Sequence, residues 1–599
     1  MTFKDLNIKS FTNKAATFSA PFPSGKSRWL SGGVGILFLL LSQFSFAQKK
    51  EQIGTETVNV VKPYTPKISD AFKVKEIPEL DEEGNAKKET IKYTIFSFPV
   101  ASTFTPSKGK AEGVEKEKQA HLFKNYATFG VGNYGTFIGE LFVNHDINNT
   151  DYVGGMFRHH SSEGGIKSVK LEDRFYDTSI DLMYGSNQKD VSWNLDLGYQ
   201  NQIYNWYGLP ANFDSTLING INPQQTYGTI SLGGNVAFNE SILNKASLKY
   251  NHFSDASGSS ENRFYAKPTV EFDVMESAVK TNIIVDYVGG SFKKNYSNTN
   301  TERVKYGFTN FGIVPSFVMQ EDDWTLNIGA GLFYSLDNEK SNNKFLVYPQ
   351  FNASYKVVGD LMIFYAGAEG NLEQNSYMDF VNENPFLSPT LNIAPTDKQY
   401  DVFAGLKGKL TNNVSYNVKA SYVNERNKAL FRSNDYDENR SDDDYAYGNS
   451  FQVVYDDMRT LSFYGELKAD FSEDVSFGIN GTFNSYTNDF QQEAWNLPTI
   501  KINSNLDFNI TEKWFACANV FYVGERKDFQ VNTDFAANSA PVTLKSYFDV
   551  NANVGFKYSD RLTAFARANN ITNKAYEKWL NYQVQGFQVI LGVNYKFDF

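Results

Sequence analysis

Cysteine is almost absent from this chain. The 599 residues include one, Cys517, so disulfide bonds within the chain cannot hold the fold together. The sequence also has no Cys-x-x-Cys pair, no phosphate-binding loop and no dinucleotide fingerprint, and these are the usual motifs for redox or metal sites and for nucleotide binding. Cys517 follows Trp514-Phe515-Ala516, and we expect it to be a small wall residue of a strand.

Long apolar runs are also scarce. The one such run, residues 32–47, is shorter than the roughly 20 residues that a membrane-spanning helix needs. It ends in Ser45-Phe46-Ala47, a small-x-small cleavage site, and basic residues precede it: Lys4, Lys9, Lys14, Lys26 and Arg28. We therefore predict a signal peptide over 1–47, with a signal anchor as the alternative. No cysteine follows the cleavage site, which argues against a lipoprotein, and we expect no membrane helix in the mature protein.

Charge and catalytic motifs exclude two further classes. The 57 basic and 68 acidic residues give a net charge of −11 without a basic patch, which argues against a nucleic-acid partner. There are five histidines and no Gly-x-Ser-x-Gly elbow. The stretch 250–254 contains His252 together with Asn251 and Ser254, residue types that a hydrolase can use. We expect no enzyme and no cofactor.

Aromatic residues are abundant, and from about residue 121 the chain alternates apolar and polar residues to its end. Aromatics make up 16% of the chain, while the mean hydropathy is −0.44. The alternation is clear in 191–199, 324–336, 414–422 and 548–558, and in the final FQVILGVNYKFDF, 587–599. The segments run for about ten residues or more, which suits a tilted strand that crosses a membrane.

Short and long connections follow one another between these segments. Short turns such as 146–151, 357–360 and 558–561 alternate with long polar loops such as 205–226 and 375–398, the pattern of an outer-membrane barrel. Following the turns gives about 22 strands, if residues 450–470 are one long strand rather than two short ones. An even number returns the carboxy terminus to the side of the amino terminus.

The predicted fold class is all-β, a transmembrane antiparallel β-barrel. A strand in hydrocarbon can leave no backbone group unpaired, so the sheet must close on itself. The alternative is a soluble propeller, but a propeller would show a repeat of about 40–50 residues, and none is present. The division is a signal peptide (1–47), an extended or lumen-threaded periplasmic segment (48–120), and the barrel (121–599). In 48–120, only residues 93–100 look like a strand.

The carboxy-terminal region resembles the end of TonB-dependent receptor barrels. Its Asn-rich segment, glycine and aromatic end fit that family at Asn570, Asn573, Tyr576, Gly586 and Phe599, and residues 455–487 resemble one of its strand pairs. Residues 125–147 resemble the first hairpin of a Bacteroidota group of such proteins. The resemblance implies an outer-membrane barrel that takes part in transport.

The resemblance fails at the plug domain. The family has an amino-terminal plug of about 130 residues, and residues 48–120 are too short and lack its mixed pattern. A barrel of about 22 strands would be an open pore without a plug, so 48–120 threads into the lumen, loops fold inward, or a partner blocks it. One segment is similar to a TonB box, which pairs with an energy transducer by strand addition: Thr55, Glu56, Thr57, Val58 and Val60. The alternative is a generic extended segment.

Two groups of residues were considered as metal ligands. His159 and His160 are adjacent, and in a strand they would point to opposite faces. The acidic stretch 433–445 contains carboxylates that calcium prefers, although a solvated extracellular loop, or one that binds ions bridging lipopolysaccharide, is the alternative. The weak candidates are Asp435, Asp437, Asp442, Asp443 and Asp444.

The last strand is similar to the signal read by the barrel-insertion machinery, with Phe599, Phe597 and Tyr595 as its residues. We expect this strand to pair with the first, near 123–131. The predicted location is the cell outer membrane, in contact with lipid and lipopolysaccharide. The first functional hypothesis is transport, with a TonB-type transducer as a candidate partner. The alternative is a non-enzymatic barrel subunit of a larger outer-membrane assembly or secretion complex.

Overall fold

The computed structural model describes residues 121–599 except 211–212, 214–215, 275–276, 297–302, 437–442 and 531–539. The predicted signal peptide, the segment 48–120, the TonB-box-like residues Thr55, Glu56, Thr57, Val58 and Val60, and the candidates Asp437 and Asp442 lie outside the described residues. No helix within the described part of the chain is long and apolar enough to span a membrane.

Twenty-two strands form one closed antiparallel sheet, so the predicted barrel and its even strand number are confirmed. The first half of the wall comprises β1 (Asn125–Gly132), β2 (Phe137–Asp146), β3 (Asp151–Ser162), β4 (Phe175–Asn187), β5 (Val191–Asn205), β6 (Gln224–Phe238), β7 (Leu243–Asp255), β8 (Ser260–Val274), β9 (Ser277–Phe292), β10 (Val304–Gln320) and β11 (Trp324–Asp337). The second half comprises β12 (Lys344–Val358), β13 (Met362–Glu373), β14 (Thr396–Thr411), β15 (Val414–Ser433), β16 (Phe451–Ser472), β17 (Val475–Asn488), β18 (Ile500–Asn509), β19 (Trp514–Val523), β22 (Tyr547–Lys557), β23 (Leu562–Asn569) and β26 (Gln588–Phe597).

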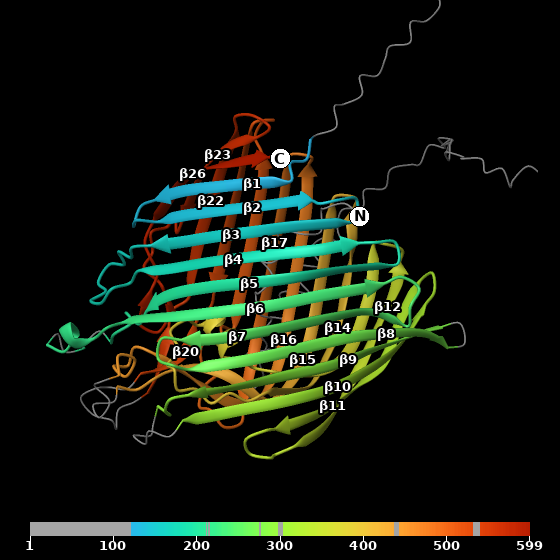
Figure 1. The fold of residues 1–599 in the computed structure, drawn as a ribbon, viewed down its shortest axis with the longest axis horizontal. Helices are drawn as coiled ribbons and strands as arrows, with labels where there is room; N and C mark the ends of the chain where they lie inside the picture. The colour runs from blue at the N-terminus through green and yellow to red at the C-terminus, as the bar shows by residue number, and fades with distance from the viewer. Residues whose placement is uncertain are drawn as a thin grey trace, which may run out of the picture. The chain divides into compact units, whose positions relative to one another are not determined.

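The barrel closes where its first and last strands meet. β1 and β26 are antiparallel neighbours, with a register that runs from Asn125 opposite Phe597 to Gly132 opposite Ile590 (Figure 1). The predicted pairing of the two chain ends of the barrel is therefore confirmed. Closure leaves no free sheet edge, as a strand in hydrocarbon requires.

Alternation along each strand separates a lipid face from a lumen face. In β5, Leu195, Leu197 and Tyr199 are exposed on the outside of the wall, and Asp196 and Gly198 between them lie on the opposite face. In β26, Leu591, Val593 and Tyr595 are likewise exposed, whereas Gln588 and Ile590 are buried. The apolar stripe at the end of the chain is the lipid-facing side of its last strand.

The region 450–470 is one strand, as predicted. β16 runs unbroken from Phe451 to Ser472, and the irregularity lies in its neighbour β15, whose register shifts between Glu425 and Lys428. A bulge of this kind adds residues to one strand without ending the pairing.

The connections at one end of the barrel are all short, as predicted, but those at the other end are not all long. Tight connections at 133–136, 256–259 and 338–343 stand among the long loops. The first is a two-residue hairpin turn, because Tyr134 and Gly135 both have left-handed backbones, with φ of 59° and 60°. The long loops expected at 205–226 and 375–398 are present, between β5 and β6 and between β13 and β14, and the tight connections occur in addition to them.

The long loops contain additional short elements that the sequence pattern did not predict. These are the 3-10 turn η4 (Ile218–Gly220), the helix α2 (Tyr377–Glu383), and two small hairpins, β20 (Arg526–Gln530) with β21 (Ala540–Leu544) and β24 (Glu577–Trp579) with β25 (Tyr582–Gln583). The largest buried apolar cluster lies among these loops, at the end of the barrel that bears them. In outer-membrane barrels, the long loops are on the extracellular side.

Candidate functional site

The extracellular mouth of the barrel is covered by loops that pack together. We call them the cap: the loops 206–223, 374–395, 434–450 and 570–587, together with the hairpin β20–β21. Loop 374–395 contains α2, which begins after Ser376, whose hydroxyl accepts a hydrogen bond from the Asp379 N–H at 3.0 Å. A serine in this position supplies one of the acceptors that the first turn of a helix lacks.

A buried glutamate of the wall binds the start of α2. Glu261 of β8 is 1% exposed, and its carboxylate accepts the N–H of Tyr377 at 2.6 Å and that of Met378 at 3.1 Å. It also accepts the hydroxyl of Tyr306 in β10, at 2.7 Å. A buried carboxylate is tolerated where donors of this kind surround it.

An arginine two residues further along β8 joins the wall to the same helix. Arg263 donates to both carboxylate oxygens of Asp286 in β9, at 3.1 and 2.8 Å, and to Asp379 of α2 at 2.6 Å. The guanidinium is thus held by the wall on one side and holds α2 on the other.

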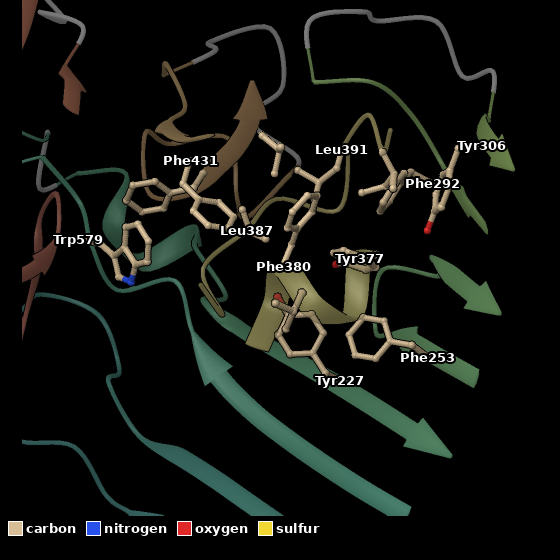
Figure 2. Close-up of a cluster of buried hydrophobic side chains, with 14 of the residues drawn as sticks. Tyr227, Phe253, Phe292, Tyr306, Tyr377, Phe380, Leu387, Leu391, Phe431 and Trp579 are labelled. Atoms are coloured by element: carbon tan, nitrogen blue, oxygen red, sulfur yellow. The ribbon is translucent and has the colours of Figure 1, made fainter. Parts of the chain in front are cut away.

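Aromatic side chains fill the space around α2. Tyr377 lies edge-on to Phe253 and Phe292, with ring centroids 5.1 and 4.9 Å apart, and Phe380 lies edge-on to Phe431 at 5.7 Å. Figure 2 shows these side chains of α2 among rings from the wall and from the neighbouring loops. Such pairs add to the free energy gained from the apolar area that they bury.

The other loops of the cap meet at Tyr582. Its ring stacks on Phe386 with centroids 3.7 Å apart and lies 4.7 Å from Tyr207. Its hydroxyl donates to the carbonyl of Asn449 at 2.6 Å, and the Tyr207 hydroxyl donates to the carbonyl of Gln583 at 2.9 Å. Burial raises the pKa of Tyr207 and of Tyr582, so both phenols keep the protons that they donate.

The hairpin β20–β21 joins the cap through Asp528, which is fully buried. The carboxylate accepts three hydrogen bonds: from the backbone N–H of Ser433 at 3.0 Å, from the backbone N–H of the neighbouring Phe529 at 2.8 Å, and from the side-chain amide of Asn496 at 2.8 Å. Burial nevertheless raises the pKa of Asp528 to about 6, because these donors do not fully replace water.

The acidic stretch that was considered for metal binding is used in contacts between loops. Asp443 pairs with Lys294 at 2.5 Å, Asp444 accepts the N–H of Asn222 at 2.8 Å, and the carbonyl of Asp435 accepts the hydroxyl of Tyr296. Among the described residues, no group of three or more His, Cys, Asp or Glu side chains could hold a metal ion.

The two adjacent histidines point to different surroundings. His159 lies against Phe137 at 5.6 Å and hydrogen-bonds to Thr178 at 2.7 Å, whereas His160 lies against Phe175 at 5.1 Å. This agrees with the expectation that neighbouring strand residues face opposite sides.

The aromatic residues proposed as the assembly signal lie together at the end of the chain. Tyr595 and Phe597 stack at 6.1 Å, and Phe599 lies edge-on to Phe597 at 5.5 Å. The role of Phe599, Phe597 and Tyr595 in assembly stays a prediction, because it concerns a step before the barrel is folded.

Sequence reasoning missed the residues that build the cap, above all Glu261, Arg263 and α2. A signal was present in the loop itself. Its stretch after α2 carries Phe386, Leu387, Leu391 and Ile393, which are more apolar residues than a solvated loop needs. Of the three ways of blocking the lumen that we considered, inward-folded loops are what the described residues show at the mouth.

Comparison with known proteins finds a similar barrel fold in solved outer-membrane proteins. No protein-family model matches the chain, and no curated protein is similar to it in sequence. Among solved structures, the pyoverdine outer membrane receptor FpvA from Pseudomonas aeruginosa PAO1 matches with a TM-score of 0.60 and 12% identity, covering 80% of each chain. The siderophore receptor PirA from Acinetobacter baumannii matches with a TM-score of 0.59 and 13% identity, covering 80% of this chain and 81% of that one.

The copper transporter OprC gives a similar result, with a TM-score of 0.58, 13% identity, and coverage of 80% of this chain and 82% of that one. At these identities the likeness concerns the fold alone. The class that the structure defines is therefore a closed 22-stranded antiparallel barrel, the fold that the carboxy-terminal motifs predicted.

Proposed function

We propose that this chain is a non-enzymatic transport barrel of the bacterial outer membrane, and that passage through it is controlled at the cap. The observation that carries the proposal is the combination of a 22-stranded wall with a mouth where loops 374–395 and 570–587 and the hairpin β20–β21 share an apolar core with the ends of wall strands. Barrels of this size enclose a lumen wide enough for a solute and need a closure. The similar structures, a siderophore receptor, a pyoverdine receptor and a copper transporter, support uptake as the general role.

The parts outside the described residues fit this proposal as follows. Residues 1–47 direct export, residues 48–120 form a periplasmic arm, and the segment Thr55–Val61 pairs with a TonB-type energy transducer. The bias toward Asn, Phe and Tyr suits a source in the Bacteroidota. These assignments rest on the sequence pattern alone.

The experiment is conductance of the purified barrel in a planar bilayer, with and without the cap loop. In the variant, residues 376–393 are replaced by a short Gly-Ser linker. The wild-type barrel is expected to stay closed, and the variant to conduct, because α2 and its apolar neighbours no longer fill the mouth. Heat-dependent migration on a gel shows that the variant still forms a barrel.

Two outcomes contradict the proposal. A large steady current through the wild-type protein would show that the cap does not close the lumen. A folded variant that remains closed would show that the barrier lies elsewhere in the molecule.

A second candidate function is a structural subunit of a larger outer-membrane assembly. The observation that favours it is the firmness of the cap, in which rings and buried hydrogen bonds hold Tyr377 and Tyr582 in fixed positions. Purification from native membranes after mild cross-linking tests it. Stoichiometric partners would support the assembly, and a barrel that is recovered alone would exclude it.

A further inference from the structure

Two charged side chains of one wall strand bind the helix α2 at the start of the cap loop 374–395, and the later part of the loop is bound to β16, where Phe451 exchanges backbone hydrogen bonds with Phe386 and Ser388. We propose that Glu261 and Arg263 of β8 form a latch that keeps this loop across the mouth, and that breaking the latch opens the barrel. The inference rests on the proposed function in one respect, that the barrel conducts once the loop is displaced.

The Glu261 half of the latch binds the backbone of the loop. Its carboxylate accepts the N–H groups of Tyr377 and Met378, which belong to the first turn of α2 and have no acceptor within the helix. Glu261 is buried, so a loop that leaves this position strands the carboxylate without two of its donors. The position of α2 on the wall is therefore strongly preferred over a position shifted by a few ångströms.

The Arg263 half binds a side chain of the loop. Asp286 on the wall accepts two hydrogen bonds from the Arg263 guanidinium. The side chain of Asp286 is 10% exposed and that of Arg263 is 19% exposed. Asp379 takes the third contact from α2 and is 41% exposed. The wall therefore fixes the direction of Arg263, and Asp379 is the end of the ion pair that water can reach and release.

The remaining contacts of the helix select its position less sharply. Tyr377 packs against Phe253 and Phe292, and burial of apolar area has no preferred direction. Its hydroxyl donates to Asp255 of β7 at 2.9 Å, and the Tyr227 hydroxyl donates to the carbonyl of Pro385 at 2.9 Å. These two bonds come from single hydroxyls, whereas the latch binds α2 itself through two backbone bonds to one buried carboxyl group and through one ion pair.

The wall itself does not depend on the latch side chains. Glu261 pairs with Gly290 and Arg263 with Val288 through the backbone register of β8 and β9. A substitution that keeps the size of either side chain should therefore leave the barrel closed as a sheet. This separates the latch from a role in holding the wall together.

The test compares single-channel conductance and vancomycin sensitivity in cells for Glu261→Gln, Arg263→Gln and Asp379→Asn. The last of these is on the loop and leaves the wall unchanged. The matched control is Asp181→Asn, which breaks the 2.7 Å ion pair between Arg158 and Asp181 on β3 and β4. The loop replacement of 376–393 serves as the reference for an open mouth, and heat-dependent migration confirms that each barrel is folded.

We expect the open probability of the Glu261→Gln and Arg263→Gln variants to rise by at least about tenfold, because losing one buried charged hydrogen bond shifts an equilibrium by roughly that factor. The rise should be smaller for Asp379→Asn, because its carboxylate is partly exposed. The Asp181→Asn barrel should remain closed. If the loop replacement conducts while all three latch variants behave as the control does, the latch is refuted and the proposed function stands. If the folded loop replacement also stays closed, it is the proposed function that fails.

Discussion

Three buried carboxylates bind backbone N–H groups at the loop-bearing end of the barrel. Glu261, Asp456 and Asp528 are each at most 1% exposed. Glu261 binds the start of α2 and Asp456 binds loop 489–499, whereas Asp528 binds the end of β15 and its own neighbour in β20. Asp456 accepts the backbone N–H groups of Asp489, Phe490 and Gln491, at 3.0, 2.9 and 2.8 Å. A carboxylate of this kind satisfies the backbone of a buried loop that has no regular secondary structure.

The first prediction at this scale concerns pH and Asp528. Its pKa is about 6 in the folded cap and about 3.9 in an unfolded chain, so the folded state binds the proton more tightly. The contribution of Asp528 to stability therefore increases as the pH falls from about 6 to about 4, by roughly 2–3 kcal/mol. Hydrogen exchange of peptides covering 524–530 and 540–546, corrected for intrinsic rates, should show more protection at the lower pH.

The control for this prediction is Asp528→Asn, which cannot titrate. The side-chain amide that this substitution introduces would donate to Asn496 once the Asn496 amide turns over, because the Asn496 oxygen has no partner in the wild type. This rotation breaks the hydrogen bond from Asn496 to the Phe431 carbonyl. The pH dependence of protection should disappear in this variant. If it persists unchanged, another group causes it.

The second prediction concerns Asp456. Asp456→Ala removes the acceptor of three consecutive N–H groups, each worth about 1.5–3 kcal/mol when bonded to a charged group, so loop 489–499 should detach from the wall. Limited proteolysis should cleave this loop at least tenfold faster. The control is Asp489→Asn, which breaks an exposed ion pair with Arg459 of the kind that contributes little, and equal cleavage of both variants would contradict the prediction.

At the scale of strands and loops, the sequence predicts the wall well and the cap poorly. Each wall strand shows its two faces in its own residues, as Leu195, Leu197 and Tyr199 do in β5, so the pattern can be read locally. The cap core takes single residues from segments far apart in the sequence, such as Phe386 of loop 374–395, Phe431 of β15 and Trp579 of β24. No period within one segment records that they meet.

A prediction at this scale concerns Gly132 at the closing pair of strands. A Cβ on Gly132 would lie 2.5 Å from the carbonyl oxygen of Val589 and 2.9 Å from a side-chain carbon of Ile590, both in β26. Gly132→Ala should therefore loosen the contact between β1 and β26 and lower the temperature at which the barrel band unfolds on a gel. Gly465→Ala in β16, where no atom lies within 4 Å of the added carbon, is the control, and identical temperatures would refute the argument.

The last residue leads to a prediction about assembly rather than stability. Phe599 is 82% exposed, while the side-chain carboxylate of Asp598 already joins the two ends of the barrel by accepting the backbone N–H of Lys124 at 2.9 Å. Deletion of Phe599 should lower the fraction of protein inserted into the outer membrane while leaving the unfolding temperature of inserted barrels unchanged. The control is Phe490→Ala, an exposed aromatic of an outer loop. Normal insertion of the deleted protein would show that Phe599 is not part of the signal.

At the scale of the whole molecule, the wall is much taller on one side than on the other. β15 and β16 have 20 and 22 residues, whereas β1 and β23 have 8 each. A tilted strand needs about 9–11 residues to cross the membrane, so β15 and β16 continue beyond it. Phe431, Phe451 and Val453 on these extensions belong to the apolar core of the cap, which makes the tall wall part of the closure.

Displacing α2 from the mouth costs free energy, and a TonB-type energy transducer is the candidate source of it. Apolar contacts and ionised hydrogen bonds hold α2 in the mouth, so spontaneous opening is rare. The TonB-box-like segment Thr55–Val61 is the candidate for coupling to an energy transducer by strand addition. Deletion of 55–61 should abolish capture of the barrel by a TonB carboxy-terminal domain and abolish uptake, with insertion and cap protection unchanged. Deletion of residues 84–90, a segment of the same length, is the control. If the TonB domain still captures the barrel after deletion of 55–61, the segment is not the attachment point and the prediction is wrong.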